Sequence, residues 1–203
     1  MPLLVALIKR PVLGAARKWV VIWSGFMVTM SALSLYFALQ HQNNHWMSYA
    51  FNPVAAALIL WALSWWQTGR RPAIVIRLLI PTIIIAWVPI VVLLEDTKSF
   101  SLLGEPLVGM VVLVTAIYTL AARTLRETRS LTEQDWFWAA IGIAVYHGAV
   151  VGFHPVSYWL LQTRPQLVIR AMEINALVEV TALLAIAWGM TREASTIRIN
   201  RGS

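Results

Sequence analysis

The stretch from Leu78 to Leu94, LLIPTIIIAWVPIVVLL, holds no charged residue and decides the fold class. At a rise of about 1.5 Å per residue, about 20 apolar residues in a helix cross the roughly 30 Å hydrocarbon core of a bilayer. This run is slightly shorter than that. We therefore expect a transmembrane helix that stands nearly upright or extends into its loops.

Five further apolar runs flank this stretch on both sides. They are Trp19 to Gln40, Ser48 to Gln67, Leu107 to Arg123, Trp136 to Leu161, and a last run from Pro165 to Met190. The composition agrees, with 59% hydrophobic and 12% charged residues and a mean hydropathy of +0.70, whereas soluble domains carry about a quarter charged residues. The sequence predicts an all-α, polytopic membrane protein, a six-transmembrane-helix bundle.

Basic residues are divided unevenly between alternate connections of these runs. One side holds three of the 16 Lys and Arg residues, Lys98, Arg164 and Arg170, and the other side holds the remaining thirteen. Basic residues near span ends are retained in the cytoplasm, so we expect both termini there (N-in/C-in). The expected location is the cytoplasmic (inner) membrane of a bacterium. The thirteen residues are Lys9, Arg10, Arg17, Lys18, Arg70, Arg71, Arg77, Arg123, Arg126, Arg129, Arg192, Arg198 and Arg201.

The chain divides into three parts around these runs. Residues 1–18 are expected to form an interfacial amphipathic segment whose basic groups face anionic lipid, residues 19–190 the transmembrane domain, and residues 191–203 a short basic cytoplasmic tail. Membrane lipids are thus expected partners, together with a protein partner or a second copy of the chain. We expect no nucleic acid partner, because the basic residues lie in short clusters between apolar runs.

Several kinds of chemistry are excluded by missing residues. The chain has no Cys, and so no disulfide, thiolate metal site or cysteine nucleophile. No span contains the Lys that a retinal Schiff base needs, and His41 and His45 fall in or beside a loop, where they do not form haem pairs. No phosphate-binding loop or nucleophile elbow is present. We expect a protein that is not an enzyme and has no cofactor, metal site or catalytic residue.

Polar residues in the fifth run mark the first part of a candidate site. An ionisable side chain in hydrocarbon is costly unless it faces the bundle interior, a partner or water. His147, Val151, His154 and Tyr158 are spaced by four, three and four residues, which places them on one face of a helix.

A comparable stripe follows in the sixth run. Met172, Asn175 and Glu179 share a face, and a helix that starts at Pro165 places Glu179 near its middle. We predict that the two stripes face each other or a shared cavity, with His147 within reach of Glu179 directly or through water. The alternative is that these groups form ordinary interhelical contacts.

Other irregular positions also fall toward the predicted outer half. Asn52-Pro53 lies in the second run and Pro155 in the fifth, and a proline inside a span frees a carbonyl group that needs a partner. These features predict an outward-facing polar cavity or, as the alternative, kinked packing without a ligand. Gly148 and Gly152 form a Gly-x-x-x-Gly pattern that allows close helix approach.

The second half of the chain resembles the closing helices of the six- or seven-span input modules of some bacterial sensor histidine kinases. The resemblance rests on the span entry Asp135-Trp136-Phe137-Trp138, on Tyr146-His147-Gly148, on Asn175 within Glu173-Ile174-Asn175-Ala176, on Trp188, and on Glu95 before Phe100. Only 13 residues follow Met190 here, so we expect no kinase domain. The resemblance thus implies a stand-alone sensor or a subunit that signals through a partner.

Three functions remain open at this point. The first is a non-enzymatic receptor-like or accessory subunit that binds a small ligand or partner helix in the outer half, with His147, His154, Tyr158, Asn175, Glu179 and Asn52 as binding or relay residues. The second is a small transporter or proton-coupled carrier that uses His147 and Glu179. The third is a structural subunit of a larger energy-converting membrane complex.

Overall fold

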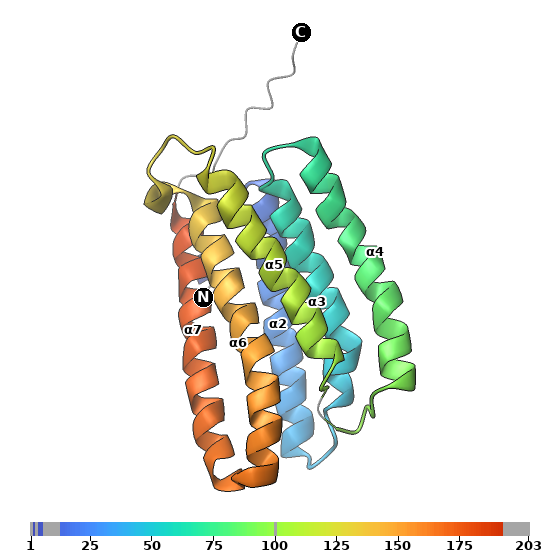
Figure 1. Cartoon of the computed structure of the whole chain (residues 1–203). Helices are drawn as coiled ribbons and strands as arrows, with labels where there is room; N and C mark the ends of the chain where they lie inside the picture. The colour runs from blue at the N-terminus through green and yellow to red at the C-terminus, as the bar shows by residue number, and fades with distance from the viewer. Residues whose placement is uncertain (1, 3, 6–12, 100, 193–203) are drawn as a thin grey trace.

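A computed structural model describes residues 2, 4–5, 13–99 and 101–192 of the chain. Within these residues every regular element is helical (Figure 1). The long helices are α2 (Ala15–Leu39), α3 (Trp46–Trp65), α4 (Arg70–Leu93), α5 (Gly104–Thr124), α6 (Asp135–Thr163) and α7 (Val168–Thr191), and the 3-10 turns η1 (Leu131–Glu133) and η2 (Pro165–Leu167) precede α6 and α7.

Five of these helices, α2 to α6, are long and apolar enough to cross a membrane. Only 17% to 50% of the most apolar window of each helix is buried inside the protein, so most apolar side chains face outward, as lipid contact requires. α7 lies outside this set of five. It is 24 residues long, packs along α6, and carries Arg170, Glu173 and Glu179.

The third helix begins earlier than its apolar run indicates. α4 starts at Arg70, eight residues before Leu78, and so includes Arg77. The guanidinium group of Arg77 lies over the rings of Trp61 and Trp65 of α3, 4.8 and 5.0 Å from their centroids. These cation–π contacts shield the charge and let the helix extend through it. The expected extension of the short third and fourth runs is confirmed, because α5 also begins before its run.

One expectation for the N-terminal segment is wrong. Residues 1, 3 and 6–12 of that segment, like residues 193–203 of the tail, lie outside the described residues, but α2 already begins at Ala15. Arg17, expected to face lipid, is only 5% exposed. Its Nε donates to Oδ2 of Asp135 at 2.9 Å, and its Nη2 donates to the backbone oxygen of Arg192 at 2.7 Å. A carboxylate at the start of α6 therefore holds this cation inside the protein.

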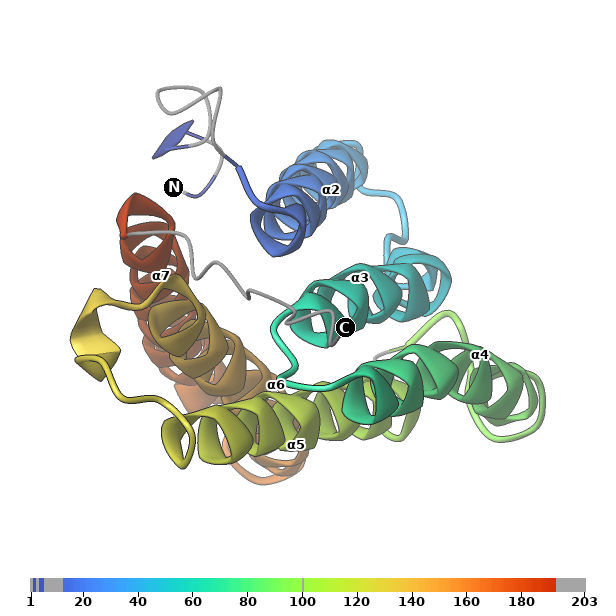
Figure 2. The same cartoon turned by 90° about the horizontal axis from the view of Figure 1, so that it is seen from above.

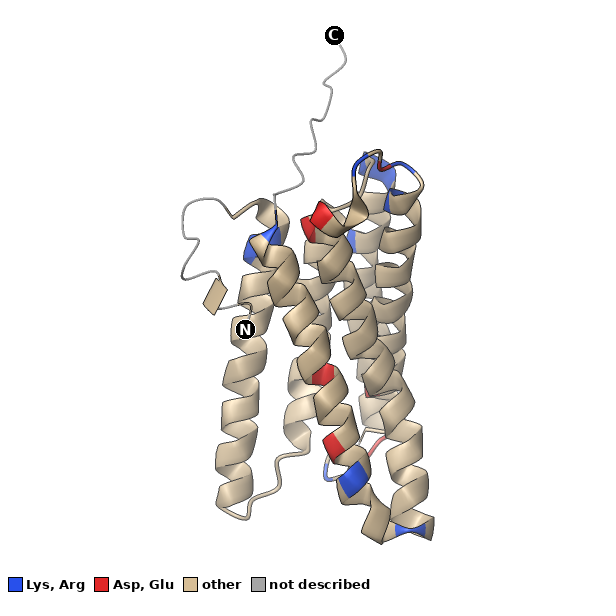
Figure 3. Ribbon diagram, turned by 90° about the vertical axis from the view of Figure 1, so that its left-hand side faces the viewer, with Lys and Arg blue, Asp and Glu red and all other residues tan. Residues whose placement is uncertain are grey.

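The helices run antiparallel, so that alternate connections lie at the same end. α2, α4 and α6 begin, and α3, α5 and α7 finish, at an end that we call the basic end, shown at the top of Figure 3. Nine of the twelve Lys and Arg residues in the described ranges lie in or near connections at this end. The opposite end, the far end, holds Lys98, Arg164 and Arg170.

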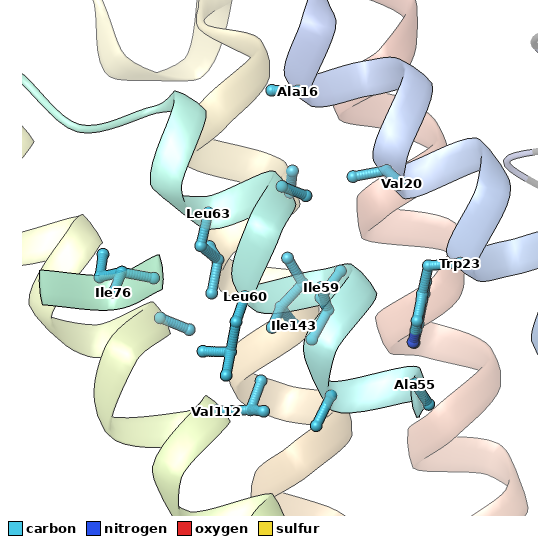
Figure 4. Close-up of a cluster of buried hydrophobic side chains, with 14 of the residues drawn as sticks. Ala16, Val20, Trp23, Ala55, Ile59, Leu60, Leu63, Ile76, Val112 and Ile143 are labelled. Carbon is cyan, nitrogen blue, oxygen red and sulfur yellow. The ribbon is translucent and has the colours of Figure 1, made fainter. Parts of the chain in front are cut away.

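Viewed from above, the helices form an arc with α2 and α7 at its two ends (Figure 2). α2 packs chiefly on α3, α3 also on α4 and α5, α5 on α6, and α6 on α7. The core lies where these contacts meet, around Ile59, Leu60 and Leu63 of α3, Val112 of α5 and Ile143 of α6 (Figure 4). α2 and α7 are therefore not neighbours along the arc.

Glycines bring α6 and α7 close together near the basic end. A Cβ atom on Gly142 would lie 2.5 Å from Cγ1 of Ile186 and 2.6 Å from the backbone oxygen of Ala182. By contrast, a Cβ on Gly152 would meet no described atom within 4 Å, and one on Gly148 only a Leu113 methyl group at 3.8 Å. The predicted Gly148–Gly152 pattern is therefore not the site of close helix approach.

Substituting these glycines tests the close α6–α7 packing. Gly142→Ala should lower the free energy of unfolding by about 1–3 kcal/mol, because the added methyl group meets backbone as well as side-chain atoms. Gly152→Ala, on the same helix, should be neutral or raise stability by about 0.5–1 kcal/mol through helix propensity. Reversible unfolding in mixed micelles measures both. Equal losses for the two variants would contradict the packing.

Candidate functional site

An open groove of about 670 Å³ lies between the far-end halves of α2 and α3. Its inner end reaches Glu105 of α5 and His154 of α6. Apolar and hydroxyl side chains share its walls. The wall residues of α2 are Phe26, Met27, Met30, Ser31, Ser34, Leu35 and Ala38, and those of α3 and its entry are Asn44, His45, Met47, Ser48, Phe51, Asn52 and Ala55.

A smaller chamber of about 50 Å³ lies behind this groove. The two cavities share four lining residues, Met27, Asn52, Ala55 and Glu105. On the opposite side the chamber is lined by the rings of Trp23 and Tyr146, which meet edge to face with their centroids 5.7 Å apart. The groove thus narrows to a small inner space enclosed by α2, α3, α5 and α6.

Glu105 and His154 form an ion pair at the inner end of the groove. Nε2 of His154 lies 3.2 Å from Oε2 of Glu105, and Nδ1 of the same ring lies 3.2 Å from the backbone oxygen of Val150. The two side chains are 15% and 23% exposed. Both ring nitrogens of His154 face oxygen atoms, so each of the two contacts needs one hydrogen atom. The pair is therefore either imidazolium with carboxylate or neutral imidazole with a protonated carboxyl group.

Two polar side chains lining the chamber have unpaired nitrogen atoms. Both ring nitrogens of His147 and Nε1 of Trp23 have no hydrogen-bond partner among the described residues. Nδ2 of Asn52 has none with good hydrogen-bond geometry, although the Asn52 amide lies next to the Glu105 carboxyl group. His147 is 8% and Trp23 1% exposed, and Figure 4 shows the Trp23 ring extending toward the level of Ala55 with its nitrogen at the tip. An unpaired buried donor costs about 1–3 kcal/mol. Such groups gathered in one cavity are characteristic of a binding site.

Half of the residues predicted from the sequence lie at these cavities. Asn52 and His154 line the groove, and Asn52 and His147 line the chamber. Tyr158 is 45% exposed and lines neither cavity.

No direct hydrogen bond joins the two predicted stripes. Asn175 and Glu179 line neither cavity, and Nδ2 of Asn175 donates to Oε1 of Glu179 at 2.7 Å within α7 itself. His147 makes no hydrogen bond with Glu179. The predicted contact of His147 with Glu179 through water stays a prediction.

The rotation of α6 explains this difference. α6 contacts α7 through the face that carries Gly142, and that close contact leaves no room for larger side chains. The histidine stripe lies on another face, where Val151 comes within 3.0 Å of a Cβ built on Gly109 of α5. The stripe therefore faces α5 and the cavities. The small residues Gly142 and Gly189 are the feature of the sequence that indicates where α6 and α7 face each other.

Glu105 is the site residue that the sequence analysis missed. The fourth run was taken to begin at Leu107, which left Glu105 in a loop, whereas it is the second residue of α5. An acidic residue followed by proline in a first helical turn was the available signal. Glu95 fixes the position of this turn, since its Oε1 accepts hydrogen bonds from the backbone nitrogens of Leu103 at 2.7 Å and Gly104 at 3.3 Å.

The described part of the chain contains no group of three or more His, Asp or Glu side chains arranged to hold a metal ion. Comparisons with protein-family models, with curated proteins and with solved structures give no match for this chain. The assignment of a function therefore rests on the geometry of the groove and the chamber.

Replacing His147 tests whether the unpaired imidazole is a cost to the fold. His147→Leu should raise the free energy of unfolding by about 1–3 kcal/mol, because leucine has a similar volume and no unpaired polar atom. His154→Leu should instead lower stability, since it leaves Glu105 without its ring partner. Unfolding measurements on both variants in the same micelles give the comparison. A destabilised His147→Leu would mean that the imidazole is paired within the fold.

Proposed function

We propose that this chain is a non-enzymatic, receptor-like or accessory protein of the bacterial inner membrane that binds a small ligand in the groove. It crosses the membrane six times with both termini in the cytoplasm, and the groove opens in the outer half. The chief support is the chamber behind the groove, where the side-chain nitrogens of Trp23 and His147 have no hydrogen-bond partner within the described part of the chain.

Two observations support the six-span arrangement. α7 packs antiparallel along α6, and a Cβ on its Gly189 would lie 2.8 Å from the backbone oxygen of Asp135 at the basic end, so the two helices share one depth range. The Asn175–Glu179 hydrogen bond offsets part of the cost of those side chains in hydrocarbon. The concentration of Lys and Arg at the basic end supports a cytoplasmic location for that end.

Single cysteines test this orientation, because the natural chain has none. A cysteine at Gln42, in the far-end connection of α2 and α3, should react with a membrane-impermeant maleimide in intact cells. A cysteine at Ser130, in the exposed basic-end connection of α5 and α6, should react only after permeabilisation. Gel-shift labelling gives the result. If the Ser130→Cys protein reacts in intact cells, the orientation is the opposite of the one proposed.

The shape of the site favours a small ligand over a partner helix. The unpaired groups lie around a chamber of about 50 Å³, which has room for one small polar group or a few water molecules. A helix, about 10 Å wide, does not reach them. The groove of about 670 Å³ lies within the usual size range of small-molecule sites.

Filling the passage between groove and chamber tests ligand binding. Ala55 lines both cavities and is 7% exposed, so the leucine of Ala55→Leu would project into the passage. Native mass spectrometry of the protein purified from its own membranes in mild detergent should show a bound small molecule, with about tenfold lower occupancy in this variant.

Ala32→Leu provides the matched control. Ala32 lies on the exposed surface of α2 and lines neither cavity, so this substitution should leave occupancy unchanged. If the Ala55→Leu and wild-type proteins carry the same molecules in equal amounts, the groove is not a ligand site.

A further inference from the structure

The hydrogen-bonding character of the chamber restricts what enters it. Nε1 of Trp23 and Nδ2 of Asn52 are donors only, and a neutral His147 offers one donor and one acceptor. The side chains that carry these atoms come from α2, α3 and α6 and are among the residues that line one space of about 50 Å³. A ligand group that satisfies them must chiefly accept hydrogen bonds. An oxygen atom with two lone pairs meets this requirement.

Charge restricts the ligand group further. Glu105 lines both cavities, and the residues that line the chamber include no Lys or Arg in the described ranges. An anionic head group would therefore lie beside the Glu105 side chain, with no Lys or Arg among the described lining residues to pair with it. Binding of a cationic ammonium group in the chamber is also disfavoured, because its N–H donors would face the N–H donors of Trp23 and Asn52. Glu105 also already has His154 as its partner at 3.2 Å. The remaining class of ligand head group is one that is uncharged and accepts hydrogen bonds.

The side chains that line the groove indicate the chemistry of the rest of the ligand. Phe26, Met27, Met30, Leu35 and Phe51 line it, and Leu35 is also 61% exposed on the outside of α2. A hydrocarbon chain fits such a wall, and methionine side chains adapt to chains of different shape. The groove is more than ten times the volume of the chamber, so the polar head is small and the apolar body is large.

We propose that the chamber binds the uncharged carbonyl head of a lipophilic ligand, such as a long-chain ketone or a quinone, whose apolar body lies in the groove. This inference rests on the proposed function, since it names the class of ligand. The carbonyl oxygen accepts hydrogen bonds from Trp23 Nε1 and Asn52 Nδ2, and His147 lies beside them. The Glu105–His154 pair lies where the groove meets the chamber and disfavours charged heads.

Three probes with the same tail separate the head groups. They are 2-dodecanone, dodecylammonium and dodecanoate, added below their micellar concentrations to the protein in lipid nanodiscs, with empty nanodiscs as the blank. Tritiated 2-dodecanone should bind saturably, and each charged probe should compete at least about tenfold more weakly, a difference of about 1.4 kcal/mol. With a ¹³C-labelled carbonyl, the bound ketone should show its C=O stretch at lower wavenumber than in lipid.

Variants assign that shift to the chamber. Trp23→Phe and Asn52→Leu should each weaken ketone binding about tenfold and return the stretch toward its lipid value. Trp159→Phe, at a position 56% exposed on α6, is the matched control and should change neither. Asn52 is half-buried, so its variant provides a second test if Trp23→Phe, within the core, fails to fold.

The outcomes separate this inference from the proposed function. Tighter binding of dodecylammonium or dodecanoate, abolished by Ala55→Leu, would overturn the carbonyl assignment and leave the groove as a ligand site. Ketone binding unaffected by both Trp23→Phe and Asn52→Leu would also overturn it. Failure of all three probes to bind above the blank would reject the inference, and the native occupancy measurement decides the proposed function independently.

Discussion

The buried ion pair between Arg17 and Asp135 determines how the rest of the bundle closes. It joins the start of α2 to the start of α6, and the second contact of Arg17, with the backbone of Arg192, adds the end of α7. Elsewhere α2 packs chiefly on α3. Removing one partner of a buried pair leaves an uncompensated charge, at a cost of about 3–5 kcal/mol. The first helix is therefore anchored to α6 and α7 at the basic end, and the groove lies at the other end, between the far-end halves of α2 and α3.

The site extends from this closed end in three steps. The Trp23–Tyr146 contact lies between the anchored start of α2 and the chamber. The chamber gathers donors from three helices, and the Glu105–His154 pair lies where it joins the groove. Apolar and polar side chains line both cavities.

The sequence predicted the helical fold well and the partners of its polar residues poorly. Hydropathy located the long helices within a few residues, except at α4, where cation–π shielding of Arg77 extended the helix beyond its apolar run. Periodicity placed His147 and His154 on one face but did not indicate which neighbour that face meets. The rotation of α6 is set by close packing at Gly142, which depends on the three-dimensional fit of two helices. Glu105 was missed because a hydropathy boundary excluded the first turn of α5.

The exposed side chain of Leu35 is part of both the outer surface and the groove wall. If this entrance faces acyl chains in a bilayer, the proposed ligand would reach it by lateral diffusion after partitioning from water. The concentration that governs occupancy is then the mole fraction of ligand in the leaflet. Two ligands with equal intrinsic affinity but different oil–water partition coefficients would differ in apparent potency by the ratio of those coefficients. Occupancy of the proposed ligand site would then depend on the lipid composition of the surrounding membrane.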